Sequence, residues 1–197
     1  SYSHPMVLLY MGGFMIAMAI EKWNLHKRIA LSIISLIGTD IQKIILGFMV
    51  STGFISMWIS NTATALMMLP IAVAVVTQLT PNEANKEVLP NNLGKALMLG
   101  IAYSASIGGM ATLIGTPTNI ILAGVIKDMY GYEISFSQWM LYGFPIAVLL
   151  LAFCWFYLVK VAYPFDKDFK IEGGKEEIQR QLSLLGPMTK EEKRVAW

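Results

Sequence analysis

The feature that most constrains this chain is a run of small polar residues, 60–64, set inside a long apolar block. The apolar stretches on either side cover residues 41–59 and 65–79, and both are suited to lipid. An unpaired amide or hydroxyl in hydrocarbon costs about 2–7 kcal/mol, so such a run needs surrounding protein or a water-filled cavity. It predicts either a binding site at membrane depth, or hydroxyls that bond to their own helix while Asn61 pairs with a neighbouring helix.

The composition is that of an integral membrane protein. Of the 197 residues, 55% are hydrophobic and 14% are charged, whereas soluble domains carry roughly 25% charged residues. The net charge is only +2 and the basic residues form no stripe between aromatics, so no nucleic acid partner is expected. The single cysteine, Cys154, leaves no internal disulfide and no cysteine metal cluster. His4 and His26 have no obvious Ser or Cys partner, so we do not expect an enzyme.

The other segments predict further helices. Residues 25–37 have the spacing of an amphipathic helix on the membrane surface, with one face made up of Leu25, Ile29, Leu31 or Ser32, Ile33 and Leu36. Residues 93–125 form a second apolar block that is interrupted at 115–119. The remaining predictions are the end of a transmembrane helix at 6–20, an aqueous loop at 80–92 and a full transmembrane span at 138–161. A T-x-x-E capping box at 189–192 predicts another helix. This capping box, together with a first residue, Ser1, that is not methionine, suggests an internal piece of a larger protein.

The basic residues predict an orientation. They flank the first segments and follow the span at 138–161, whereas the loop after residue 125 holds only Lys127. The positive-inside rule then puts the basic regions in the cytoplasm and that loop outside. A re-entrant hairpin over 41–79 and two full spans predict the same sidedness, so the residues alone leave both open.

An interrupted helix at membrane depth offers carbonyl groups at one half-helix end and N–H groups at the other. Ser56 precedes Ser60 by four residues, so both hydroxyls are expected to face the same way. With the Asn61 side-chain oxygen they can contribute to a cation site. The N–H groups of Asn61 and Thr62, which open the second arm, can meet an anion.

The second interruption has comparable features. Thr116 is suited to cap a new half-helix, and Pro117 fits its first turn. Gly115 permits a sharp turn, while Gly108 and Gly109 permit close backbone approach. Neither interruption contains Asp, Glu, Lys or Arg. A neutral site of this kind is consistent with an anion whose charge is balanced by cotransported cations.

Two segments resemble a known family. Residues 56–65, SMWISNTATA, closely resemble the first Ser-Asn-Thr signature of the divalent anion/sodium symporter family. Residues 106–119, SIGGMATLIGTPTN, resemble the second conserved break in the same half. The tripeptide alone is unspecific, but the two segments together are a strong match, and the resemblance spans nearly the whole chain.

The resemblance implies an all-α integral membrane protein of the ion-transporter type. Its fold would contain a re-entrant helical hairpin and a discontinuous transmembrane helix, together half of an inverted repeat. The function implied is Na⁺-coupled symport of C4-dicarboxylates such as succinate or malate, or of related divalent anions, by an elevator mechanism. It also implies a multi-pass protein of the cell (inner) membrane that is a homodimer at full length.

The resemblance also implies site residues, with Na⁺ as the coupling ion. Asn61 and Thr62 would bind the substrate. Na⁺ would be held by Ser56, Ser60 and Asn61 and by backbone carbonyls of Gly115, Thr116, Pro117 and Thr118. No second Ser-Asn-Thr tripeptide occurs, so the second sodium site and the other half of the substrate site are not expected here.

The expected organisation has four parts. They are a scaffold helix end with an interfacial helix (1–38), a re-entrant hairpin (39–80), a discontinuous helix with the following transmembrane helix (93–161), and a cytoplasmic linker with the start of the next helix (162–197). Two alternatives for function remain open. One is a citrate, sulfate or other anion transporter with different ion coupling, and the other is a membrane sensor or scaffold that does not transport.

Overall fold

The computed structural model describes residues 25–37, 40–78, 89–165, 179–180 and 182–188, with isolated positions between 8 and 22. These residues form helices and connecting segments without a strand. Some predictions fall wholly or largely outside the described residues. They are the helix end at 6–20, most of the loop at 80–92, most of the linker after residue 165, and the capping box at 189–192.

The described helices agree closely with the predicted segments. In chain order they are α2 (Leu25–Ile37), α3 (Ile41–Ser56), α4 (Asn61–Gln78), α5 (Leu89–Ala111), α6 (Pro117–Tyr130), α7 (Phe136–Tyr157) and the π-helix η2 (Leu158–Ala162). α5 begins at Leu89, within the predicted loop, and Pro90 in its first turn costs no helical hydrogen bond. Among the described helices, the continuous stretch Phe136–Ala162 is long and apolar enough to cross a membrane.

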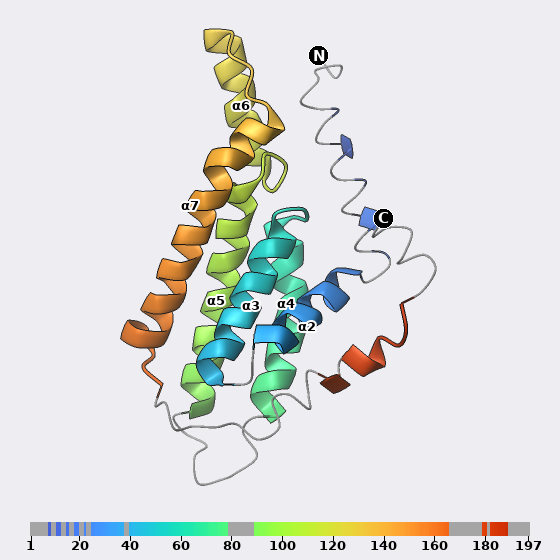
Figure 1. Ribbon diagram of the computed structural model, residues 1–197, viewed down its shortest axis with the longest axis vertical. Helices are drawn as coiled ribbons and strands as arrows, with labels where there is room; N and C mark the ends of the chain where they lie inside the picture. Colours follow the sequence, from blue (N-terminus) through green and yellow to red (C-terminus); the bar gives the residue numbers. More distant parts are fainter. Residues whose placement is uncertain are drawn as a thin grey trace.

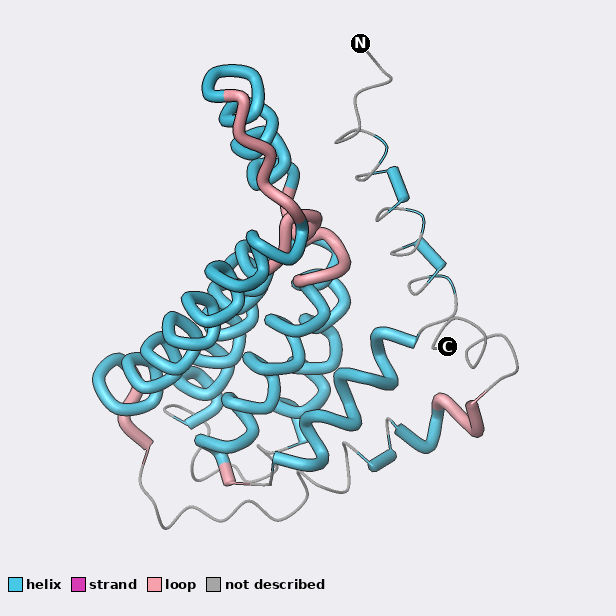
Figure 2. The backbone as a smooth tube through the Cα atoms, turned by 45° about the horizontal axis from the view of Figure 1, so that its top comes forward, coloured by secondary structure: helices cyan, strands magenta, loops and turns pink. Residues whose placement is uncertain are grey.

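The interrupted blocks form a hairpin and a broken helix that lie side by side. Figure 1 shows α3 and α4 as an antiparallel pair, and their connecting turn at 57–60 lies near the upper end of α5. α6 extends beyond that turn, and α7 returns along α5 toward the opposite end. α2 crosses the hairpin, as Figure 2 also shows. This arrangement brings both interruptions to one level of the molecule.

α3 is the central helix of this arrangement. It contacts α2, α4, α5 and α7, and most of its residues are buried, whereas Lys43 and Phe54 on its remaining face are exposed. Burial over most of the circumference is typical of a helix packed among several others. Gly47 lets α2 approach, because a Cβ there would lie 3.2 Å from the Cα of Ile34. The Ser51 hydroxyl also donates to the Ala30 carbonyl at 3.2 Å. The first hairpin arm is therefore fixed between α2 and α5.

The helix predicted at 25–37 is present as α2, with the same bounds, but it packs through a different face. Its buried residues are Ala30, Leu31 and Ile34, whereas Leu36, assigned from its spacing to the apolar face, is 83% exposed. The buried face is the one that meets α3, because the glycine at position 47 leaves room there for the α2 backbone.

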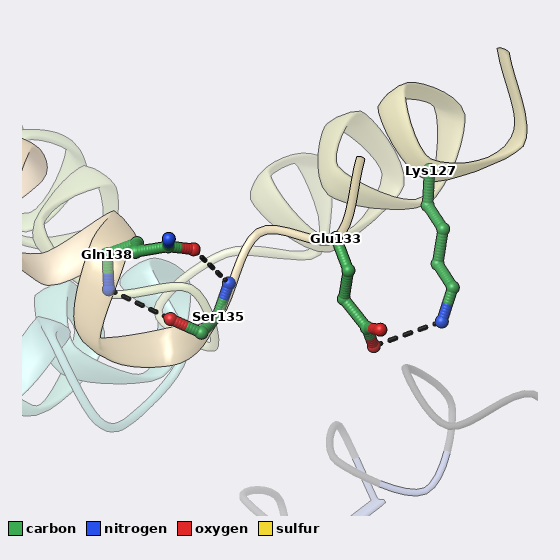
Figure 3. Close-up of polar contacts among 4 residues, drawn as sticks. All are labelled: Lys127, Glu133, Ser135 and Gln138. Atoms are coloured by element: carbon green, nitrogen blue, oxygen red, sulfur yellow. Dashed lines mark hydrogen bonds and ion pairs between the residues drawn. The ribbon is translucent and has the colours of Figure 1, made fainter. Parts of the chain in front are cut away.

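A short connection sets where α7 begins. Gly131 ends α6 with φ of 67°, and its N–H donates to the Lys127 carbonyl. An ion pair of 3.0 Å between Lys127 and Glu133 holds the following segment against α6 (Figure 3). Ser135 and Gln138 then cap α7 reciprocally, each side chain accepting from the other residue's N–H. These contacts place the first turns of α7 beside the end of α5.

Candidate functional site

The two interruptions predicted from the sequence are in direct contact. The turn between α3 and α4 contains Met57, and the segment between α5 and α6 begins at Thr112. The Thr112 hydroxyl donates to the Met57 carbonyl at 2.6 Å, and both residues are buried. The ends of two broken helices therefore meet around one point.

Three oxygens gather on the α3 side of this point. The Ser56 hydroxyl lies 2.7 Å from the Asn61 Oδ1 atom and 2.7 Å from the Ala105 carbonyl oxygen. A hydroxyl carries a single proton, so it cannot fully satisfy both acceptors. Ser56 is completely buried, and the group has an excess of oxygen lone pairs over protons. An excess of this kind suits a hard cation, which prefers oxygen ligands.

Glycines allow this close approach. A Cβ on Gly109 would overlap the Asn61 amide, and a Cβ on Gly108 would overlap the backbone of Gly53. A Cβ on Gly115 would lie 2.5 Å from the Gly109 carbonyl oxygen. The close backbone approach predicted for the Gly108–Gly109 pair is confirmed, and these glycines let the hairpin tip and the second break gather around α5.

The carbonyl groups at the end of α5 have partners from other elements. The Asn119 amide of α6 donates to the carbonyls of Gly109 at 2.9 Å and Thr112 at 2.8 Å. The indole N–H of Trp139 in α7 donates to the Met110 carbonyl at 3.0 Å. The last carbonyls of a helix have no partner within it, so these side chains stabilise the end of α5.

Ser60 does not extend the α3 helix as the sequence spacing assumed. α3 ends at Ser56, so the two serines are not on consecutive turns of one helix. Ser60 is exposed, and its hydroxyl accepts from the Ala63 N–H at 3.3 Å, which caps the start of α4. The expectation that both hydroxyls face the same way is therefore wrong, because it assumed that the α3 helix continues to Ser60.

The other predicted residues lie around the same two breaks. Thr62 is exposed in the first turn of α4, and Gly115 is buried between α5 and α6. Thr116 occupies the N-cap position of α6 as predicted, but its side chain makes no capping hydrogen bond. Pro117 begins α6, and Thr118 beside it is exposed. The contacts described for Ser56 and Asn61 lead instead to α5, one to two turns before this break.

Several residues around the site were missed by sequence reasoning. Asn119 and Thr112 are buried polar residues in an apolar block, and that contrast is a signal that was present in the sequence. Thr64 follows Asn61 by one turn of α4 and is 1% exposed. Its hydroxyl has no hydrogen-bond partner among the described residues. Ala105 gave no signal of contact with Ser56. Gly109 was predicted to allow close approach, but the sequence did not show that Asn61 is its partner, because that contact depends on how α5 packs.

The residues that the structure brings together at the two breaks are electrically neutral. The described ion pairs, Lys43 with Asp40 at 2.7 Å and Lys127 with Glu133 at 3.0 Å, belong to the start of α3 and the end of α6. Within the described ranges no three His, Cys, Asp or Glu side chains come together to hold a metal ion. The available ligands are hydroxyl, amide and carbonyl oxygens on one side, and the N–H groups that open α4 on the other. Such an arrangement can bind a hard cation beside an anion.

Two comparisons relate this chain to known proteins. The family model described as "Sodium:sulfate symporter transmembrane region" matches residues 1–197. The sodium-dependent dicarboxylate transporter SdcS of Staphylococcus aureus strain USA300 is 46% identical over 194 residues, which cover 98% of this chain. SdcS of strain NCTC 8325 is 45% identical over the same length. The chain spans 37% of the length of these curated relatives.

Proposed function

This chain belongs to the sodium:sulfate symporter family of membrane proteins, and we propose that it forms one part of a Na⁺-coupled symporter for C4-dicarboxylates. Related divalent anions such as sulfate are the alternative substrates, because the family description names sulfate and the relatives are named for dicarboxylates. The observation that carries the proposal is the meeting of two helix breaks at Met57 and Thr112. Paired half-helix ends at membrane depth are the usual construction of ion-coupled transport sites.

The cation site is proposed on the α3 side of the breaks. Na⁺ would bind the oxygens of Ser56 and Asn61, with Ser60 and the carbonyls of residues 115–118 completing the set implied by the family resemblance. The short distances from Ser56 to two other oxygens support this assignment, because one proton is shared among three oxygens.

The anion site is proposed at the start of α4. The N–H groups of Asn61 and Thr62 open this helix, and a helix N-terminus favours negative charge. Thr62 is exposed, so its hydroxyl is accessible to a carboxylate. Among the residues that the structure describes, no basic side chain lies at the site to neutralise the anion, and the bound Na⁺ would supply that charge. This coupling makes transport of the anion depend on Na⁺.

The hairpin α3–α4 is proposed to be re-entrant. The 16 residues of α3 span about 24 Å, less than a hydrocarbon core of about 30 Å. The 27 residues of Phe136–Ala162 span about 40 Å. The extension of α6 beyond the hairpin tip also supports this proposal (Figure 1).

The complete protein is proposed to be a homodimer with several spans in the cell (inner) membrane. The hairpin and the broken helix would move against a scaffold by an elevator mechanism, with α2 linking the two. The second half of the inverted repeat would supply the second sodium site. The four proposed parts are residues 1–38, 39–80, 93–161 and 162–197, the last being cytoplasmic.

The test is uptake of labelled succinate by proteoliposomes that contain the full-length protein carrying this chain. Accumulation is expected with an inward Na⁺ gradient and is expected to fall to the level of empty liposomes when choline replaces Na⁺. Uptake that is indifferent to Na⁺ would contradict the coupling. Uptake of citrate or sulfate without succinate would contradict the substrate assignment. Binding without uptake of any of these anions would instead favour a non-transporting sensor.

Thr62→Ala is expected to weaken anion binding more than Na⁺ binding. The hydroxyl is proposed to meet the substrate, and hydrogen bonds to charged groups contribute about 1.5–3 kcal/mol. We expect the succinate concentration for half-maximal uptake to rise about tenfold, with little change in the Na⁺ concentration for half-maximal uptake.

A matched control for this variant is Thr77→Ala. Thr77 is also exposed, lies at the other end of α4, and donates only to the Val73 carbonyl of its own helix. Its loss is expected to leave both half-saturating concentrations unchanged. Equal losses of succinate and Na⁺ affinity in Thr62→Ala would contradict the division of roles.

A further inference from the structure

The buried hydroxyls of this protein differ in what they bond to. Thr52 and Ser104 donate to carbonyls one turn earlier in their own helices. Thr112 is equally buried, but it donates to Met57, 55 positions away in the chain. A hydroxyl that bonds within its helix adds no connection between elements. The Thr112 hydroxyl connects the second break directly to the hairpin tip.

The partner of this hydroxyl is a carbonyl at the end of a helix. Met57 follows the last residue of α3, where carbonyls lack helical partners. The residue is 5% exposed, so water is not a ready substitute. An unpaired buried acceptor is costly, so the Thr112 hydroxyl favours the position of Met57 in which this bond forms.

Asn119 holds the donor in place. Its amide donates to the carbonyl of Thr112 itself and to that of Gly109. The side chain of Asn119 is 7% exposed and extends from the first turn of α6. A continuous set of hydrogen bonds therefore runs from α6 through the end of α5 to the hairpin tip. The Gly109 backbone, which this set fixes, is also the surface on which the Asn61 amide lies.

We infer that Thr112 and Asn119 are positioning residues for the proposed cation site. They act through Met57 and Gly109, which fix the distance between Asn61 on α4 and Ser56 on α3. The inference rests on the proposed Na⁺ coupling, but it assigns these two residues a role in Na⁺ affinity without direct contact with the ion. Loss of the Thr112 hydroxyl therefore raises the Na⁺ concentration needed for half-maximal uptake, while the maximal uptake rate is retained.

The test uses the full-length protein with Thr112→Val, which has nearly the same shape without the hydroxyl. Na⁺ is titrated in succinate uptake by proteoliposomes, and separately as the Na⁺-induced rise in melting temperature of the purified protein in detergent. We expect the half-saturating Na⁺ concentration to rise about tenfold in both measurements, equivalent to about 1.4 kcal/mol. The maximal uptake rate at saturating Na⁺ is expected to stay within about twofold of wild type. Asn119→Leu should also raise the half-saturating Na⁺ concentration.

Three further variants make the test specific. Thr112→Ser keeps the hydroxyl and should restore wild-type Na⁺ dependence. Thr112→Ala removes the hydroxyl without added bulk and should behave like the valine variant, so a packing defect of valine alone is detected. Thr52→Val removes an equally buried hydroxyl that bonds within α3, and it should leave Na⁺ dependence unchanged.

The outcomes separate this inference from the function on which it rests. Wild-type half-saturating Na⁺ in both Thr112→Val and Thr112→Ala would overturn the positioning role while Na⁺ coupling stands. An equal shift in Thr52→Val would also overturn it, because any buried hydroxyl would then have the same effect. A wild-type protein that responds to Na⁺ in neither measurement would overturn the proposed function itself, and the inference with it.

Discussion

Asn61→Ala is expected to reduce Na⁺-driven succinate uptake to the level of empty liposomes while the protein is still produced and folded. The Asn61 amide lies at the centre of the site, 2.7 Å from the Ser56 hydroxyl and against the backbone of Gly109. Alanine removes the proposed Na⁺ ligand at the residue that also opens the anion-binding helix. Both halves of the coupled site are thus affected by one substitution.

The fold is expected to tolerate this change. When the amide is removed, the Ser56 hydroxyl can still donate to the Ala105 carbonyl at 2.7 Å, so no buried donor is left without an acceptor. The measurements are uptake, expression level and the elution profile in detergent. Asn92→Ala is the control. Asn92 lies in the first turn of α5, at the end of that helix away from the site, so this variant should transport normally. Wild-type uptake by Asn61→Ala would remove Asn61 from the site.

Gly108→Ala is expected to have the largest effect on folding. A Cβ at this position would overlap the backbone of Gly53 in α3, and a backbone cannot rotate away as a side chain can. Adding a buried methyl group to a packed interface costs about 1–3 kcal/mol, and more where the backbone must move. The crossing of α3 and α5 would have to open, which separates Ser56 from Ala105. We therefore expect a lower melting temperature together with loss of uptake.

Gly124→Ala is the matched control for this substitution. Gly124 also lies within a helix, α6, but nothing lies within 4 Å of a Cβ built there. Alanine favours a helix over glycine by about 1 kcal/mol, so the melting temperature should be unchanged or slightly higher. The close-contact explanation fails if Gly108→Ala and Gly124→Ala have the same melting temperature and the same uptake.

The fold was largely predictable where a local pattern carries it. The bounds of α2 agree with the predicted 25–37, because an amphipathic spacing is set by neighbouring residues. The break before Pro117 was predictable because proline favours the first turn of a new helix. The sequence predicted the start of α5 at residue 93, whereas the helix begins at Leu89. Its first turn is polar, so an apolar pattern does not mark it. The re-entrant placement of the hairpin stays a prediction.

The candidate site was predictable in part. Both breaks were evident as polar runs in apolar segments, and their contact through Thr112 and Met57 agrees with a shared site. The spacing of Ser56 and Ser60 was misleading, because i and i+4 positions share a face only while the helix continues. α3 ends at Ser56, and the residue after it starts a turn whose direction no spacing rule specifies.

The sequence by itself determined the membrane composition, the positions of the helices and breaks, and the neutral polar residues available at each break. Only the tertiary structure decided which oxygens come together. Ser56 meets Ala105, 49 positions away, because glycines at 53 and 108 let α3 and α5 approach closely. Local patterns record how a residue relates to its neighbours in the chain, whereas a binding site depends on how separate helices pack. That packing is set by the shapes of facing surfaces, which appear in the sequence only as scattered small residues.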